Sequence, residues 1–131
     1  MSRSTAAAVA AAAALLVAVA ARAALAQDTY SSRFDGTDLD AILADEGRVD
    51  QYVRCFLAEK DDDCDEVGRR VKAVLAEALT TDCAKCTERQ KVGLPKTVRF
   101  LARERPDAWQ QIQGKFDPKR RYAAAHPELS Q

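Results

Sequence analysis

The chain has 131 residues, with 20 basic and 20 acidic side chains, so its formal net charge is zero. This balance excludes the global basic excess by which many nucleic-acid-binding proteins attract phosphates. The chain has one histidine and four cysteines. Any partner must therefore be selected by a local site.

The first 26 residues have the three parts of a secretory signal peptide. Arg3 supplies a positive charge, residues 6–21 form an uncharged run of Ala, Leu and Val, and Ala24-Leu25-Ala26 is a small-x-small cleavage pattern. A membrane anchor takes about 20 strongly apolar residues, whereas this run is rich in alanine and is followed by Arg22. A mitochondrial transit peptide is the main alternative, because the segment has Arg and Ser and no acid.

Cleavage after Ala26 would leave one domain of 105 residues, 27–131, which is enough for one modest hydrophobic core. Because Arg3 and Arg22 leave with the leader, this domain has 18 basic and 20 acidic residues and a net charge of −2. The last residues, 126–128, have the composition of a loose tail.

Apolar residues recur at helical spacing in five stretches of this domain, and none alternates convincingly with period two. In chain order, these stretches begin near Asp38, Glu46, Asp65, Thr87 and Pro106. The strongest signal is residues 65–79, where valines, leucines and an alanine form one stripe. Thr87 and Gln90 make a capping box for the fourth helix. Pro95 lies inside that helix, where we expect a kink or a late effective start. The pattern predicts an all-α fold.

The four cysteines have the spacing Cys55-x8-Cys64-x18-Cys83-x2-Cys86. An even number in a small exported domain is typical of disulfides, and three pairings are possible. Bridges between sequence neighbours are geometrically easy, since residues three apart in a helical turn have Cα atoms about 5 Å apart. Two alternatives stay open: a four-cysteine zinc site, although x8 is unusual, and a redox pair at Cys83 and Cys86.

Several segments together resemble the arthropod chemosensory proteins, also called the OS-D family. They are Asp38-Leu39-Asp40-Ala41-Ile42-Leu43-Ala44, Tyr52-Val53 before Cys55-Phe56-Leu57, Cys83-Ala84-Lys85-Cys86-Thr87-Glu88 leading to Gln90, Trp109, and Lys115-Phe116-Asp117-Pro118. The resemblance runs from about Tyr30 to Tyr122. It implies a compact all-α bundle of about six helices around an elongated apolar channel. It also implies two local disulfides, Cys55–Cys64 and Cys83–Cys86, and secretion into extracellular fluid.

The chain departs from the family pattern at three places. Eight residues separate the first two cysteines, more than in many members of the family. Phe34 stands where a tyrosine is common, and Pro95 stands where a helix-favouring polar residue is usual. The last departure concerns the geometry of the fourth helix and of any pocket wall that it forms.

The resemblance also implies which residues line the channel. They are Phe34, Ile42, Leu43, Tyr52, Val53, Val67, Val71 and Trp109. Such stripes are more often core than ligand wall, but in a bundle with a channel the same side chains can be both. Tyr52 and Trp109 each offer an apolar ring and a hydrogen-bond donor for a ligand head group, or else are buried rings bonded to backbone.

No catalytic residue, metal ligand set or cofactor site emerges from the sequence. His126 is the only histidine, and no nucleophile and acid converge on it in sequence. We therefore expect a monomeric, secreted, extracellular, non-enzymatic carrier of small apolar ligands, such as fatty acids, long-chain alcohols, esters or other semiochemicals. We expect no nucleic-acid partner and no stable membrane insertion after leader removal. The alternative is an extracellular signalling or developmental protein that acts through a protein partner.

Overall fold

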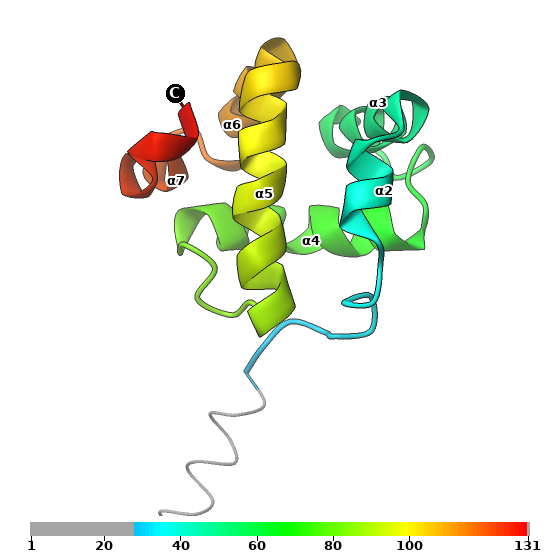
Figure 1. The fold of residues 1–131 in the computed structure, drawn as a ribbon, viewed down its shortest axis with the longest axis horizontal. Coiled ribbons are helices and arrows are strands. Elements are labelled where there is room, and N and C mark those ends of the chain that lie inside the picture. Colours follow the sequence, from blue (N-terminus) through cyan, green and yellow to red (C-terminus); the bar gives the residue numbers. More distant parts are fainter. Residues whose placement is uncertain (1–27, 131) are drawn as a thin grey trace, which may run out of the picture.

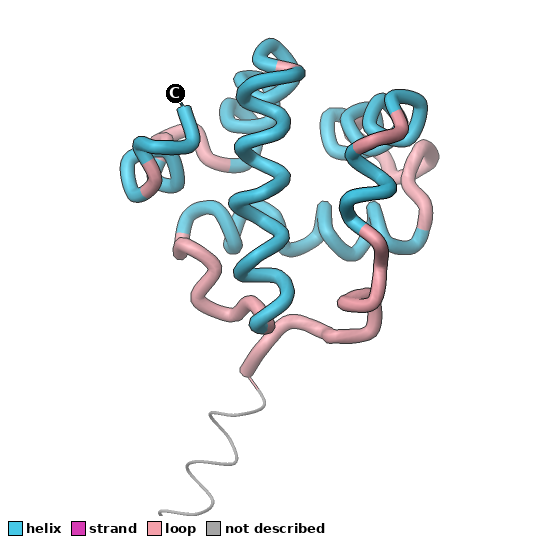
Figure 2. The backbone as a smooth tube through the Cα atoms, viewed as in Figure 1, coloured by secondary structure: helices cyan, strands magenta, loops and turns pink. Residues whose placement is uncertain are grey.

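The structure is a computed structural model that describes residues 28–130. The expected signal peptide, residues 1–26, lies outside this range. The described part contains six α-helices, one short 3-10 helix and no strand, which confirms the all-α prediction (Figures 1 and 2). The elements are α2 (Leu39–Leu43), α3 (Glu46–Leu57), α4 (Glu66–Thr80), α5 (Glu88–Glu104), α6 (Pro106–Phe116), α7 (Arg121–Ala125) and the 3-10 helix η1 (Pro127–Ser130).

Side-chain caps fix where the first four of these helices begin. The carboxylates of Asp38, Asp45 and Asp65 each accept a hydrogen bond from the backbone amide three residues later, at 2.7–3.2 Å. Thr87 and Gln90 form the complete capping box that their spacing predicts. Each cap satisfies an amide that has no partner within its own helix, so short polar residues set the helix boundaries.

Helix α5 is continuous through Pro95, and it begins at Glu88 directly after its cap. Of the two expected alternatives, a kink or a late start, the late start is therefore wrong, because the capping box fixes the first turn ahead of the proline. Pro95 has no amide hydrogen to donate to the carbonyl of Lys91, so the helix loses one internal hydrogen bond there. About two helical turns precede Pro95 and more than two follow it, and the hydrogen bonds within these turns keep the helix continuous.

The main core joins α3, α4, α5, α6, α7 and η1. Its buried members are Val49, Leu75, Leu79, Val98, Leu101, Trp109, Ile112, Tyr122 and Leu129. In Figure 1, α5 stands in the middle of the molecule, α4 runs across behind it, and α2 and α3 lie to one side. The elements on the other side, α7 and η1, contact α4 and α5 respectively.

The two disulfides join sequence neighbours, as expected. Cys55 pairs with Cys64 across a Cα–Cα distance of 4.8 Å, and Cys83 pairs with Cys86 across 5.0 Å. The first bridge clamps the corner between α3 and α4. Lys72 reinforces the same corner, because its ammonium donates to the carbonyls of Ala58 and Lys60 as well as to a carboxylate.

The C-terminal segment is ordered against the fold and is not the expected loose tail. Leu129 is buried in the main core. The two ring nitrogens of His126 lie 2.6 Å from an Asp82 carboxylate oxygen and 3.3 Å from a Glu128 oxygen. The ring of His126 also packs on that of Tyr122, with centroids 4.5 Å apart. These contacts bind η1 to the loop between α4 and α5.

Candidate ligand-binding site

The apolar stripe of α4 is covered along one edge and open along the other. Leu75 and Leu79 are buried in the main core. Val67 and Val74 are only half-buried, and Val71 between them is 38% exposed. Exposed aliphatic surface inside a predicted core stripe marks a place where the neighbouring helices do not close over it.

The spacing of the helices also indicates that one edge of the α4 stripe is open. No Cα atom of α5 comes within 8 Å of a Cα atom of α3 or α4, although α5 packs directly against α2, α6 and η1. Closely packed helices have axes 8–10 Å apart. Side chains rather than backbone therefore occupy the region between α5 and the α3–α4 pair. Phe56 and Leu57 on α3, and Leu94 and Phe100 on α5, are apolar side chains that pack against the main core and stay partly exposed.

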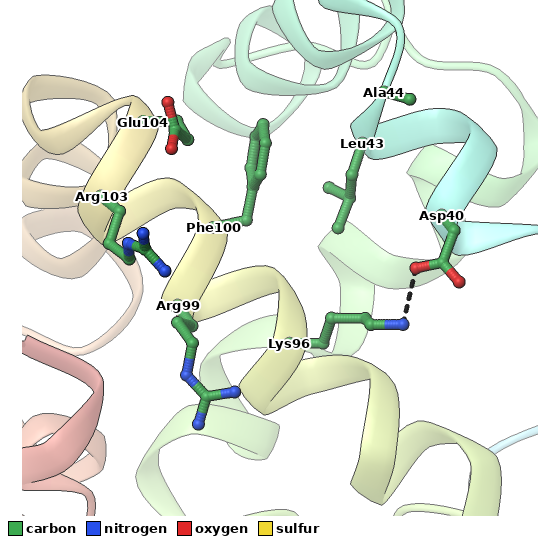
Figure 3. A pocket seen from close by; sticks show the side chains of 8 residues that line it. All are labelled: Asp40, Leu43, Ala44, Lys96, Arg99, Phe100, Arg103 and Glu104. Carbon is green, nitrogen blue, oxygen red and sulfur yellow. Dashed lines mark hydrogen bonds and ion pairs between the residues drawn. The ribbon is translucent and has the colours of Figure 1, made fainter.

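An open pocket of about 460 Å³ lies between α2 and α5. Its lining residues are Asp40, Leu43, Ala44, Lys96, Arg99, Phe100, Arg103 and Glu104. Figure 3 shows the side chains of Leu43 on α2 and Phe100 on α5 in the space between the two helices. The ammonium of Lys96 lies 2.6 Å from a carboxylate oxygen of Asp40 and ties the two helices together at one end. The volume lies within the range of ordinary small-molecule sites.

Of the eight residues predicted to line a channel, Leu43 is the one that lines this pocket. Ile42, its neighbour on α2, is buried. Phe34 is half-buried in the loop before α2, with the Arg33 guanidinium 5.2 Å from its ring centroid. Val53 is partly buried against the main core. Val67 and Val71 lie on the half-open stripe of α4 described above.

The two predicted aromatic head-group partners are both engaged within the protein. The Tyr52 hydroxyl donates to the carboxylate of Asp65 at 2.9 Å, and the other oxygen of that carboxylate caps α4. Burial, followed by this hydrogen bond, raises the pKa of Tyr52. Trp109 is 8% exposed and belongs to the main core. The lining role of these two rings stays a prediction.

Sequence reasoning missed the contribution of α5 to the pocket. Residues 96, 99, 100, 103 and 104 follow the spacing i, i+3, i+4, i+7 and i+8, which places them on one face of a helix. That face is mostly charged, so a search for apolar stripes passes over it. A search for cations grouped around one aromatic residue would have found it.

Within residues 28–130, no group of three or more His, Cys, Asp or Glu side chains is arranged to hold a metal ion. No helix in that range is long and apolar enough to cross a membrane.

The chain is similar to proteins of known family. The model of the insect pheromone-binding family A10/OS-D matches residues 30–124. Ejaculatory bulb-specific protein 3 of Drosophila melanogaster is 34% identical over 97 residues, which cover 74% of this chain and 75% of that protein. Allergen Tha p 1 of Thaumetopoea pityocampa is 36% identical over 95 residues, covering 72% and 74% respectively.

A solved structure has the same fold. It is a chemosensory protein in complex with bromo-dodecanol, with a TM-score of 0.68 and 26% identity, covering 78% of this chain and 97% of that one. The family match extends from the loop before α2 into α7, and so includes both disulfides and the pocket. The chain belongs to the insect pheromone-binding family A10/OS-D.

Proposed function

We propose that this protein is a secreted carrier that binds small apolar ligands along the open edge of α4, in the region between α4 and α5. The observation that carries the proposal is the exposed Val71 on the apolar stripe of α4, whose other edge, with Leu75 and Leu79, is buried in the main core. A relative with the same fold was solved with a brominated twelve-carbon alcohol, which supports an apolar chain as the ligand.

Desolvation supplies the binding free energy in this mechanism. Each buried methylene contributes about 0.8 kcal/mol, so a twelve-carbon chain gains roughly 10 kcal/mol before the costs of association and ordering. Micromolar affinity then needs no strong polar anchor. The protein should accept alcohols, esters and acids of similar length.

We propose binding without catalysis. All four cysteines are held in disulfides. His126 has both ring nitrogens beside carboxylates rather than beside a nucleophile. The described residues thus offer neither a free thiol nor a histidine placed beside a nucleophile.

Fluorescence of Trp109, the only tryptophan, tests the carrier function in a titration with straight-chain alcohols. Affinity should rise with chain length between about ten and eighteen carbons, because longer chains bury more methylenes. Failure to bind any of these chains below about 100 μM, roughly −5.5 kcal/mol, would favour action through a protein partner.

A matched pair of variants locates the site. Val71→Glu should weaken binding, because an unpaired charge would face the apolar chain. Val92→Glu is the control, since Val92 is 68% exposed on α5 and the change adds the same charge. Circular dichroism must show that both variants keep their helix. A folded Val71→Glu protein that binds as well as the parent would remove Val71 from the lining.

Secretion is a separate part of the proposal. We expect cleavage close after Ala26, because Ala24-Leu25-Ala26 fits the signal-peptidase pattern. N-terminal sequencing of protein recovered from culture medium should give a first residue at or near Gln27. Retention in mitochondria would instead support the transit-peptide alternative.

A further inference from the structure

The pocket between α2 and α5 combines an apolar floor with a cationic wall. Lys96, Arg99 and Arg103 of α5 line the pocket together with Phe100, and Leu43 lines it from α2 (Figure 3). Phe100 also packs against the main core, so it connects this pocket with the interior of the bundle. A long apolar chain that leaves the interior here would meet positive charge at the surface.

The cations of this wall differ in what they already bind. Lys96 is paired with Asp40 at 2.6 Å. Within residues 28–130, no carboxylate forms an ion pair with Arg99 or Arg103, whereas the next arginine on the helix, Arg105, pairs with Asp50 at 2.7 Å. With Lys96 paired to Asp40, the remaining charged groups of the lining are these two guanidinium groups and the single carboxylate of Glu104. Two guanidinium groups are therefore available to an anion from outside.

The chemistry of these groups selects the ligand class. A guanidinium presents several N–H donors in a fixed plane that matches a carboxylate, and such charge-assisted hydrogen bonds are stronger than neutral ones. An alcohol or ester head group offers no charge to balance. The apolar floor formed by Leu43 and Phe100 suits the first methylenes of a chain.

We propose that Arg99 and Arg103 bind the carboxylate head group of a long-chain fatty acid at the α2–α5 pocket, with its chain passing over Leu43 and Phe100. This inference rests on the proposed carrier function and deepens it. The protein then discriminates acids from neutral chains of equal length at this pocket, while both gain the same free energy from the buried chain.

The test compares dodecanoate with 1-dodecanol at about pH 8, for the parent and for the double variant Arg99→Gln/Arg103→Gln. Dodecanoate affinity should fall about five- to tenfold, which is the size expected for losing two partly solvated charge contacts. Dodecanol affinity should stay within about twofold. Arg69→Gln/Arg70→Gln is the control, because it removes two exposed arginines from α4 and changes the net charge equally.

The dependence of binding on salt concentration tests the charge contacts of the head group independently. Raising the ionic strength to about 1 M should reduce the dodecanoate-to-dodecanol affinity ratio of the parent and leave that of the double variant almost unchanged, because salt screens exposed charge contacts.

The outcomes separate this inference from the carrier function. If the parent binds both chains and the double variant weakens neither, or weakens both equally, the head-group site is wrong and the carrier function stands. An equal loss of dodecanoate binding in the control variant would also overturn the site, because net charge alone would explain it. If the parent binds neither chain, the carrier function itself fails.

Discussion

Asp117 organises the C-terminal third of the fold, so its removal should have a large and calculable effect. Its side chain is almost completely buried, at 1% exposure. One carboxylate oxygen accepts from the amide of Arg121 at 3.0 Å, and the other accepts from the amide of Tyr122 at 2.9 Å. These two bonds satisfy the first amides of α7 and hold Tyr122 in the main core.

Asp117→Ala leaves both amides without an acceptor, one of them buried and one partly buried. A buried donor without a partner costs about 1–3 kcal/mol, and the partly solvated one costs less. We expect the free energy of unfolding to fall by about 2–4 kcal/mol. At about 4–8 °C for each kcal/mol in a domain of this size, the melting temperature should fall by at least about 8 °C.

Urea unfolding followed by far-UV circular dichroism, with both disulfides oxidised, measures this loss. Asp62→Ala is the control, because Asp62 is exposed in the loop between α3 and α4 and should change stability by less than about 0.5 kcal/mol. An Asp117→Ala protein as stable as the Asp62→Ala control would refute the view that this carboxylate holds α7 in place.

Two further predictions concern other tethers of the fold. Hydrogen bonding to Asp82, and secondarily to Glu128, raises the pKa of His126 despite its partial burial. The contact of His126 with these carboxylates should therefore stabilise the fold fully below the unfolded pKa of histidine, about 6.5. This stabilisation should weaken as the pH rises through the higher pKa of His126 in the folded protein. His126→Gln should lose more unfolding free energy at about pH 5.5 than at about pH 8.5 in urea titrations; equal losses would contradict this. Replacing Cys55 and Cys64 together by alanine should cost at least about 2.7 kcal/mol, from the entropy of a ten-residue loop. If calorimetry shows that the free energy of unfolding falls by less than about 1 kcal/mol, the Cys55–Cys64 bridge adds little stability.

Local features of the fold could be predicted from the sequence because their causes are local. The stripe of 65–79 and the capping box at Thr87 and Gln90 lie within α4 and α5, and both appear in the structure. The cysteine pairing needed more than spacing, since three pairings were possible. The resemblance to a family supplied the choice that the structure contains.

Features that depend on tertiary packing could not be predicted from the sequence. Leu129 is a single apolar residue in a polar tail, so nothing in its neighbourhood predicts that it reaches the main core. The α2–α5 pocket depends on the juxtaposition of Leu43 and Phe100, which are far apart in the chain. Periodicity placed Val71 on the apolar stripe of α4, but it cannot tell whether neighbouring helices cover that position.

The most direct test of the carrier function is to observe where an apolar chain lies. Isotope-filtered nuclear Overhauser spectra of the labelled protein with unlabelled 1-dodecanol would report protons of the ligand close to valine methyl groups. We predict saturable contacts from the dodecanol methylenes to the methyl groups of Val71, and none to those of the exposed Val92 on α5. Contacts confined to Val92, or no saturable contact with either valine, would contradict binding along the open edge of α4.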